Sequence, residues 1–471
     1  MKIPRHAFRE YDIRGVADRD LTSDVVRALG ATFALVLRRD RADPGYRPRV
    51  AVGRDGRLSS DRLFAALSEG LLEGGADVTS VGVGPTPLLY FAAHHLGTDG
   101  AVMITASHNP GPDNGFKMMR GKASFFGADI QGLADLIEEG AALRSPTFVR
   151  GELTEQDLEA AYIDAVRAAS RLPHARTRLV VDGGNGAAGP LGVRTLTALG
   201  FTPDPLFCDM DGTFPNHHPD PTVPENLEAL RARVLETGAE LGVAWDGDGD
   251  RLGVIDDRGE ILWGDRLLVL FARALLREQP GATILGEVKC SEALYADIAA
   301  RGGRPILWKT GHSLIKTKMK EEGALLAGEM SGHMFFADRW FGFDDAIYAT
   351  ARLLEIAAGE GRRLSELLAD LPETFATPEL RVDCPDALKF DVVRRVTDRF
   401  RGTHRVIDID GARVDFGDGA WGLCRASNTG PVLVLRFEAR SGARRDAIRA
   451  EVEAVVAVAL RDALALAPVA P

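Results

Sequence analysis

The sequence predicts an α/β protein made of three related α/β domains in tandem, followed by a smaller α+β domain. The chain has 471 residues, which is too long for a single hydrophobic core. An apolar run that enters a polar loop and precedes a helix-like segment recurs at residues 49–53, 178–182 and 282–286. From about residue 378 several short strands follow one another. We therefore place the four domains at residues 1–150, 151–253, 254–372 and 373–471.

The first domain should alternate strands and helices. Its first helix is predicted to begin at Thr22 or Ser23, because either side chain can cap a helix ahead of the apolar face that follows. A strand at residues 49–53 then leads to a second helix, which the serine pair at 59–60 can cap. A five-residue apolar run at 101–105 is bounded by glycine and turn residues, so we expect a buried strand there.

The later domains repeat this order before the pattern changes. The apolar run at 178–182 enters a glycine-rich turn at 183–189, and strands are expected at 241–245 and 252–255. The run at 282–286 opens the third domain. For the last domain we predict helices at 392–400 and 445–464, and strands at 379–383, 405–409, 412–416, 422–424 and 432–438.

Composition limits the classes of function. The net charge of −11 argues against nucleic-acid binding, which needs a basic surface, and an anionic substrate would require Arg and Lys gathered locally. No window approaches the ~18 apolar residues of a membrane span, and the N-terminus lacks a signal-peptide core, so we expect a soluble, cytoplasmic protein. The four cysteines are scattered without metal-ligand spacing, which predicts reduced, structural thiols rather than zinc or disulfides.

Ser107 lies at the end of the apolar run 101–105, where parallel sheets place chemically active loops. The segment from Asn109 to Gly115 consists almost entirely of turn residues, so we expect the serine at a loop tip. A serine at such a place is usually only a turn former. The residue alone therefore does not establish a reactive site.

Residues 246–250 read Asp-Gly-Asp-Gly-Asp, with three carboxylates at alternate positions that can surround one hard cation. Mg²⁺ fits, because a few carboxylates leave coordination positions free for a phosphate oxygen. An exposed acidic turn and a calcium EF-hand are the alternatives. The EF-hand fails on position, because Arg251 stands where its glycine belongs and Asp257 where its bidentate glutamate belongs.

The glycine-rich turn offers a different class of function. Residues 184–189, Gly-Asn-Gly-Ala-Ala-Gly, follow a predicted strand and precede Asp204, so they match the dinucleotide fingerprint of an oxidoreductase. A lone match of this kind is weak, because close packing of a helix on a strand also selects glycines.

Two further loops carry polar side chains suited to a sugar phosphate. In residues 328–333, Gly-Glu-Met-Ser-Gly-His, Glu329 and Ser331 are two residues apart on an extended loop and can point the same way, toward neighbouring hydroxyls. In residues 425–429, Arg-Ala-Ser-Asn-Thr, Arg425 can present its planar fork to a phosphate. An ordinary polar loop is the alternative for the first loop, and a capped turn for the second.

Together these loops resemble the motifs of the α-D-phosphohexomutase superfamily, in the family's order along the chain. The carriers are Thr-Ala-Ser-His-Asn-Pro at 105–110 with Gly-Phe-Lys at 115–117, Asp-Gly-Asp-Gly-Asp-Arg at 246–251, Gly-Glu-Met-Ser-Gly-His at 328–333 and Arg-Ala-Ser-Asn-Thr-Gly-Pro at 425–431. The resemblance implies four domains around a central cleft. It also implies an isomerase that converts hexose 1-phosphates to 6-phosphates, with Ser107 as the phosphorylated residue and a hexose 1,6-bisphosphate as intermediate and activator.

The resemblance assigns a role to each matching residue. Ser107, Asp246, Asp248 and Asp250 would hold Mg²⁺. Catalytic roles fall to Ser107, Lys117, His312 and Arg14, with Lys117 and His312 hypothesised as general acid and base. Phosphorylated hexoses, the expected partners, would be bound by Tyr11, Arg251, Lys289, Glu329, Ser331, His333, Arg425, Ser427, Asn428 and Thr429.

The specificity within the family is less sharply predicted. Met330 is typical of the branch that acts on mannose and glucose phosphates, whereas glutamine is usual there in phosphoglucosamine mutases. A phosphoglucosamine mutase therefore remains an alternative, and a dinucleotide-dependent oxidoreductase a remote one. No nucleic acid, membrane or obligate protein partner is expected.

Overall fold

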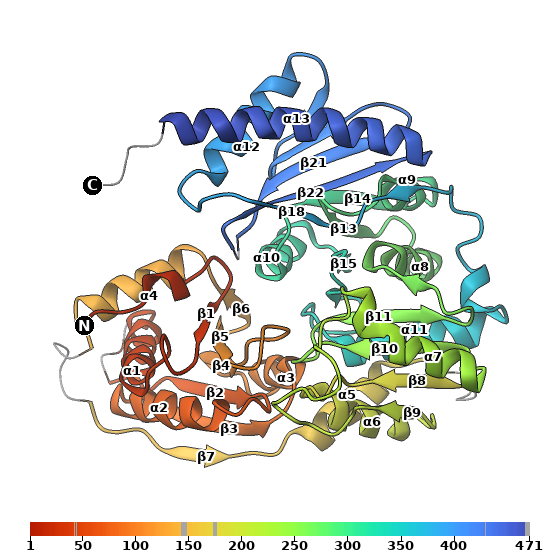
Figure 1. The fold of residues 1–471 in the computed structure, drawn as a ribbon. Coiled ribbons are helices and arrows are strands. Elements are labelled where there is room, and N and C mark those ends of the chain that lie inside the picture. The colour runs from red at the N-terminus through yellow and green to blue at the C-terminus, as the bar shows by residue number, and fades with distance from the viewer. Residues whose placement is uncertain (42, 44, 143–147, 173–176, 429, 467–471) are drawn as a thin grey trace.

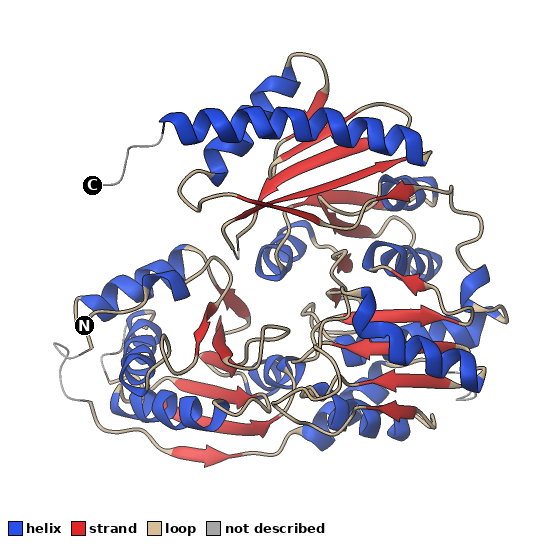
Figure 2. Ribbon diagram, in the orientation of Figure 1, coloured by secondary structure: helices blue, strands red, loops and turns tan. Residues whose placement is uncertain are grey.

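A computed structural model of the chain describes residues 1–41, 43, 45–142, 148–172, 177–428 and 430–466. Within these ranges the chain forms four sheets, each with its own helices, which follow one another around an arc (Figure 1). We call the four sheets with their helices the first to fourth units. Three units mix parallel and antiparallel strands, and the fourth is antiparallel with two helices on one side (Figure 2).

The first sheet has the strand order β1-β5-β4-β2-β3-β7, with β6 paired to β5. Its strands are β1 (Ile13–Val16), β2 (Arg49–Arg54), β3 (Asp77–Val83), β4 (Gly100–Ile104), β5 (Asp113–Arg120), β6 (Ala123–Phe125) and β7 (Leu153–Glu155). The helices of this unit are α1 (Ser23–Arg39), α2 (Ser60–Glu73), α3 (Thr86–Leu96) and α4 (Ala128–Glu138). Thr22 caps α1 through a hydrogen bond from the Val25 amide, as predicted.

The second sheet has the order β12-β11-β10-β8-β9 and the third the order β14-β13-β15-β16. The second contains β8 (Leu179–Asp182), β9 (Asp204–Leu206), β10 (Leu241–Trp245), β11 (Leu252–Asp256) and β12 (Ile261–Leu262), with helices α5 (Glu159–Ala169), α6 (Ala188–Ala198) and α7 (Glu228–Thr237). The third contains β13 (Thr283–Glu287), β14 (Arg304–Trp308), β15 (Leu326–Gly328) and β16 (Met334–Phe336), with helices α8 (Gly264–Glu278), α9 (Glu292–Ala300), α10 (His312–Glu322) and α11 (Ala346–Glu360).

The first three sheets share one arrangement, which explains the repeat seen in the sequence. In each, the strand that opens the repeat (β2, β8 or β13) pairs in parallel with the strand after it and with a third strand (β4, β10 or β15). The third strand then turns into an antiparallel neighbour (β5, β11 or β16). The turns between these strand pairs are residues 105–112, 246–251 and 329–333, so three of the predicted site loops occupy the same place in three related sheets.

The fourth unit is an antiparallel sheet of order β17-β22-β21-β20-β19, with β18 also paired to β22. Its strands are β17 (Phe375–Ala376), β18 (Leu380–Asp383), β19 (Arg405–Ile407), β20 (Ala412–Asp415), β21 (Trp421–Ala426) and β22 (Val432–Ala439). The helices α12 (Lys389–Arg401) and α13 (Gly442–Leu466) cover this sheet (Figure 1). The predicted α+β architecture of the last domain is confirmed.

Strand pairing moves two of the expected domain limits. Residue 253 falls inside β11, and β12 still belongs to the second sheet, which therefore extends to Leu262. The limit at residue 150 precedes β7, which pairs with β3 of the first sheet. Both short strands were missed because two or three residues carry too little periodicity to be recognised.

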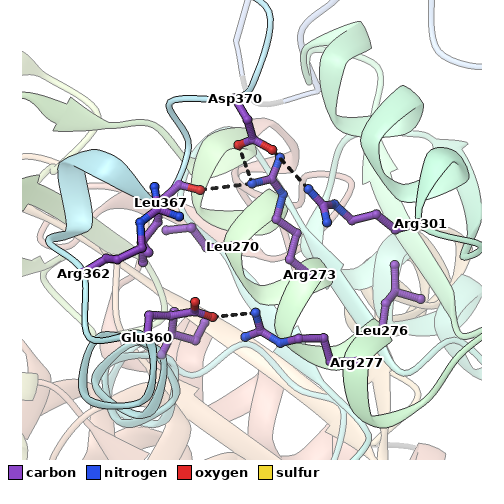
Figure 3. A pocket seen from close by; sticks show the side chains of 10 residues that line it. Leu270, Arg273, Leu276, Arg277, Arg301, Glu360, Arg362, Leu367 and Asp370 are labelled. Carbon is purple, nitrogen blue, oxygen red and sulfur yellow. Dashed lines mark hydrogen bonds and ion pairs between the residues drawn. The ribbon is translucent and has the colours of Figure 1, made fainter.

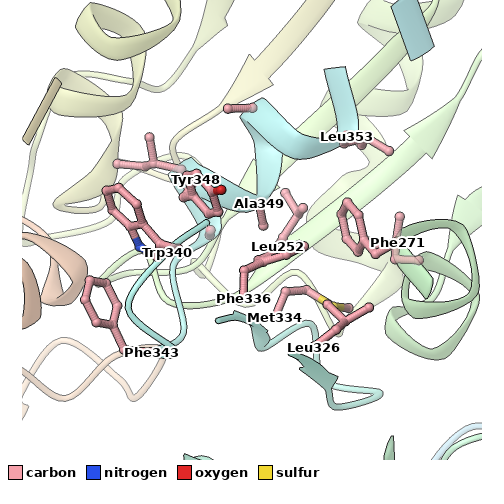
Figure 4. Packing of buried hydrophobic residues seen from close by; sticks show 14 of the residues in the cluster. Leu252, Phe271, Leu326, Met334, Phe336, Trp340, Phe343, Tyr348, Ala349 and Leu353 are labelled. Atoms are coloured by element: carbon pink, nitrogen blue, oxygen red, sulfur yellow. The ribbon is translucent and has the colours of Figure 1, made fainter. Parts of the chain in front are cut away.

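The first three units share the largest hydrophobic cluster, the first unit has a second cluster of its own, and the fourth unit has a separate core. The largest cluster joins one face of the first sheet to the second and third units, and Figure 4 shows its centre, where β11, β15, β16, α8 and α11 meet. Trp340 stacks on Tyr348 in this cluster, with ring centroids 4.4 Å apart. The fourth unit touches the third through a small cluster of Val288, Trp421 and Leu423. The apolar contact that attaches the fourth unit to the third is therefore much smaller than the cluster that joins the first three units.

Candidate active site

Ser107 lies directly after β4 and is buried, with 1% of its surface exposed. Its hydroxyl donates to Asp246 Oδ2 at 2.6 Å and lies 3.0 Å from His108 Nδ1. The Ser107 backbone has φ +52°, in the left-handed region, which costs a residue other than glycine about 1–2 kcal/mol. The Thr105 hydroxyl accepts the Ser107 N–H at 2.9 Å, and so helps to hold this conformation. The left-handed backbone of Ser107 is therefore held by neighbouring residues, because serine itself disfavours this conformation.

The acidic loop 246–251 approaches the serine loop so closely that one of its residues must be glycine. A Cβ added to Gly247 would stand 2.3 Å from the Ser107 carbonyl oxygen, closer than van der Waals contact allows. The two loops therefore touch backbone to backbone. This contact brings the hydroxyl of one loop to the carboxylates of the other.

Gly247→Ala is expected to lower the free energy of unfolding by about 1–3 kcal/mol, the usual cost of overpacking a rigid site. Urea denaturation measures this change. Gly132→Ala, within α4, is the matched control: its added Cβ would meet no atom within 4 Å, and it should raise stability by about 0.5–1 kcal/mol. Equal stability of Gly247→Ala and the wild type would mean that the two loops separate without cost.

The three aspartates predicted to hold a metal lie together and are fully buried. Oδ1 of Asp246 accepts backbone N–H groups from Gly249, Asp250 and Arg251 at 3.0–3.1 Å. Burial, and then the charges of Asp248 and Asp250, raise the pKa of the Asp246 carboxyl well above its usual value. The crowded negative charge favours binding of a cation.

The free oxygens of this cluster fit a hard divalent ion. Oδ1 of Asp248 and Oδ1 of Asp250 are buried and accept no hydrogen bond within the described part of the chain. Buried carboxylate oxygens without partners are costly, and coordination of Mg²⁺ would satisfy them. One ligand atom from each aspartate lies within 4.8 Å of the others. The residues present therefore fit the predicted metal.

Lys117 on β5 neutralises part of the cluster. Its ammonium donates to Asp248 Oδ2 at 2.6 Å and also to Asp250. Burial opposes the charged form, but the two carboxylates prevail and raise the pKa of Lys117 well above its usual value. Lys117 therefore carries a proton and a positive charge within the carboxylate cluster that the Ser107 hydroxyl contacts. This state suits a proton donor or a charge stabiliser better than a base.

His333 and Asp344 form a second group with Asp250 that has the geometry of a metal site. The tautomer of His333 argues against a metal there. Arg251 donates through Nε to His333 Nε2 at 3.0 Å, so the ring proton resides on Nδ1. Nδ1 lies 3.0 Å from Asp344 Oδ2 and 3.5 Å from Asp250 Oδ1, so it faces carboxylates as an N–H.

His312 begins α10 and stacks on His333, with ring centroids 5.6 Å apart. Burial lowers the pKa of His312 well below its usual value, which leaves the imidazole neutral. Among described residues its Nδ1 has no hydrogen-bond partner, and it lies 3.8 Å from Asp344 Oδ2. A neutral imidazole with a free nitrogen can accept a proton.

The loop 329–333 holds its predicted hydroxyl-binding pair together. Glu329 accepts the Gly311 N–H at 2.7 Å through one oxygen and the Ser331 hydroxyl at 2.9 Å through the other. Glu287, at the end of β13, accepts from the Thr310 hydroxyl at 2.7 Å and from the Met330 amide at 3.3 Å. The buried Glu287 carboxylate therefore joins the loop that contains Thr310 to the loop that contains Met330.

The predicted phosphate loop contacts both the first and the third units. Arg425, on β21, donates through Nε to Asp410 Oδ2 at 3.0 Å, and Asp410 also accepts the Thr310 N–H at 3.0 Å. The Tyr11 hydroxyl donates to the Thr310 carbonyl at 2.7 Å and accepts from Asn428. Of the predicted loop residues, Thr429 lies outside the described residues.

The remaining predicted residues contact the serine loop or residues of the fourth unit. Arg14 donates to Asn109 Oδ1 at 2.9 Å and so supports the serine loop. Lys289 is buried and lies 3.2 Å from Glu379 of the fourth unit. Ser427 accepts Lys389 through its backbone carbonyl at 2.6 Å. Glu287, Thr310 and Asp410 were not predicted as site residues, because they contact residues that are distant in the sequence.

The glycine-rich turn before α6 has a packing role. A Cβ at Gly186 would stand 2.8 Å from the Gly247 carbonyl, and one at Gly189 would stand 2.4 Å from the Cys208 carbonyl. Asp204, the acidic residue of the dinucleotide fingerprint, is paired with Arg233 at 2.7 Å. These contacts account for the glycines without a cofactor and remove the support for the oxidoreductase alternative.

A pocket of about 380 Å³ lies beside α8 and the end of α11, and none of the predicted site residues lines it (Figure 3). Four arginines line it, but three are neutralised by carboxylates. Arg273 pairs with Asp370 at 2.8 Å, Arg301 pairs with the same carboxylate at 3.2 Å, and Arg277 pairs with Glu360. The pocket therefore offers little free positive charge to an anion.

A buried serine hydroxyl on a carboxylate cluster that fits a divalent ion, with a lysine paired to the same cluster, has the groups that phosphoryl transfer requires. Models of the phosphoglucomutase/phosphomannomutase family match the same chain. The α/β/α domains I, II and III match residues 5–143, 160–259 and 263–375, and the C-terminal domain matches residues 379–455.

Named relatives agree over nearly the full length. A phosphomannomutase/phosphoglucomutase of Pseudomonas aeruginosa is 45% identical over 438 residues, 93% of this chain and 92% of that protein. A phosphoglucomutase of Neisseria gonorrhoeae is 44% identical over 457 residues, which are 96% of this chain and 97% of that protein. The structure of a phosphoglucomutase/phosphomannomutase family protein from Burkholderia thailandensis superposes with a TM-score of 0.89 at 44% identity, covering 97% of this chain and 98% of that one.

The chain belongs to the phosphoglucomutase/phosphomannomutase family. The predicted family, four-domain fold class and enzyme class, a phosphohexomutase, are thereby confirmed. None of the described helices is long and apolar enough to cross a membrane.

Proposed function

We propose that this enzyme interconverts the 1- and 6-phosphates of mannose and glucose through phosphorylated Ser107 and a hexose 1,6-bisphosphate. The observation that carries the proposal is the 2.6 Å hydrogen bond from the Ser107 hydroxyl to Asp246, next to two carboxylates with free oxygens. A phosphoryl group on Ser107 would therefore meet a cation held by these aspartates. Mg²⁺ supplies charge neutralisation and orientation of the phosphoryl oxygens when bound.

The residues around Ser107 divide the proton chemistry between them. In the forward step the O6 hydroxyl of a hexose 1-phosphate attacks the phosphorus, the bond to Ser107 Oγ breaks, and a hexose 1,6-bisphosphate forms. His312, which is neutral and whose Nδ1 has no hydrogen-bond partner among the described residues, would take the hydroxyl proton. Lys117, kept protonated by two carboxylates, stabilises the charge near Ser107 Oγ or gives it a proton.

The second half of the reaction needs the intermediate to turn around. Arg425, Ser427, Asn428 and Thr429 would hold whichever phosphate is not reacting, and Glu329 and Ser331 would bind hydroxyls that are similarly placed in both orientations. After the turn, the phosphate at C1 passes to Ser107 and leaves a hexose 6-phosphate. Free hexose 1,6-bisphosphate would act as activator by phosphorylating Ser107.

Three finer points belong to the same proposal. The proposed domain limits follow the expected division, except that strand pairing extends the first domain to Glu155 and the second to Leu262. The cytoplasm is the proposed location. Phosphorylated hexoses are the proposed partners, without nucleic acid, membrane or an obligate protein.

Initial rates on mannose 1-phosphate, glucose 1-phosphate and glucosamine 1-phosphate, with Mg²⁺ and catalytic hexose bisphosphate, test the proposal. We expect turnover of the first two substrates and its loss in Ser107→Ala. A preference for glucosamine 1-phosphate would keep the mechanism and transfer the enzyme to the phosphoglucosamine branch. Full activity of Ser107→Ala would refute the phosphoserine.

A further inference from the structure

We infer that Arg57 is a positioning residue for phosphoryl transfer, because it fixes the backbone that carries Ser107. This inference rests on the proposed role of Ser107. Arg57 follows β2, and its side chain is 0% exposed. The structure directs its guanidinium to the serine loop.

Three backbone carbonyls of the serine loop, and that of Asp113 at the start of β5, accept hydrogen bonds from this one side chain. Nη2 donates to the carbonyls of Ser107 at 2.7 Å and Asn109 at 2.6 Å. Nη1 donates to the carbonyls of Pro110 at 2.7 Å and Asp113 at 3.0 Å. A planar guanidinium with donors in fixed directions can satisfy four acceptors at once, which a single ammonium group cannot do.

Arg57 is itself held from both sides. Its Nε lies 3.2 Å from Asp55 Oδ2, and the other Asp55 oxygen accepts the Ser60 hydroxyl at 2.6 Å at the start of α2. The ring of Phe214, from the second unit, lies 5.1 Å from the guanidinium carbon. The Arg57 side chain is thus held in place by contacts with both the first and the second unit.

The contact explains how Ser107 keeps a left-handed backbone. The Ser107 carbonyl lies between Arg57 Nη2 at 2.7 Å and Gly247, where a Cβ would stand 2.3 Å away. Rotation of the Ser107 peptide would break the first contact or collide with the second. The direction of Oγ toward Asp246 follows from this peptide, so Arg57 sets the line along which the phosphoryl group is transferred.

The test compares Arg57→Lys and Arg57→Ala with Arg54→Lys, a matched control whose arginine pairs with Asp61 on α2 and does not reach the serine loop. The primary readout is the single-turnover rate of Ser107 phosphorylation by glucose 1,6-bisphosphate, followed by intact-protein mass. We expect Arg57→Lys to lower this rate and kcat about 100-fold, the usual effect of misplacing a reacting group by about 1 Å. KM for hexose 1-phosphate should change little, and Arg54→Lys should behave as wild type.

Chemical rescue separates positioning from general structural support. Guanidinium ion, at concentrations too low to denature the protein, should restore part of the phosphorylation rate of Arg57→Ala and have no effect on wild type. Unchanged phosphorylation in a folded Arg57→Lys protein would overturn the inference. So would a defect in both variants that follows the loss of thermal stability and that guanidinium does not reverse. Failure of the wild type to become phosphorylated would instead overturn the proposed function.

Discussion

Asp248→Asn is expected to lower kcat by at least about 100-fold, because a metal ion supplies several kcal/mol of charge stabilisation in such sites. Asp248 offers one buried oxygen without a partner and pairs with Lys117 through the other. Asparagine keeps the shape of the side chain but removes its charge. The concentration of Mg²⁺ needed for half-maximal rate should therefore rise as well. Steady-state rates over a Mg²⁺ titration measure both effects.

Asp204→Asn is the matched control for this substitution. Asp204 belongs to the same unit but pairs with Arg233, away from Ser107. We expect its kcat and Mg²⁺ dependence to equal those of the wild type. Chelation of divalent ions should reduce the wild type to the level of Asp248→Asn. If Asp248→Asn retained the wild-type rate and Mg²⁺ requirement, the cation would bind elsewhere.

The fold could be predicted wherever an element carries its own periodicity. The strands that open the repeats at 49, 178 and 282 are β2, β8 and β13, and each occupies the same position in its sheet. The prediction from sequence was wrong where strand pairing overrides the local preference of the residues for a turn. Residues 109–115 consist of turn formers, yet β5 begins at Asp113, because β1 and β4 both pair with it.

The candidate site could be predicted where several functional residues are contiguous. The loops around Ser107, Asp246 and Glu329 each contain a recognisable motif, and the structure brings them to equivalent turns of three sheets. Contacts that a residue makes through its own backbone leave no such pattern. Thr310 accepts a hydrogen bond from Tyr11 at its carbonyl and donates its N–H to Asp410, and neither contact depends on its side chain.

We predict that the fourth unit opens to let the bisphosphate turn, so a link that holds it closed should stop multiple turnover. Arg9 of the first unit lies 3.3 Å from Asp386 of the fourth, and the only apolar cluster that joins described residues of the third and fourth units is small. We expect Arg9→Cys/Asp386→Cys, joined by a cleavable thiol crosslinker, to transfer one phosphoryl group and then lose most of its steady-state rate.

Cleavage of the crosslinker should restore the steady-state rate, and each single-cysteine variant treated with the reagent should remain active. The native thiols interfere little: three are buried, and burial raises the pKa of the half-buried Cys208 to about 12, which keeps it in the unreactive thiol form. The measurement is a comparison of single-turnover and steady-state rates before and after cleavage. An intact crosslink with full steady-state turnover would mean that the intermediate turns inside a closed site. In that case the contacts of Tyr11 with Thr310 and Asn428 would persist through the whole cycle and would not be broken at each turnover.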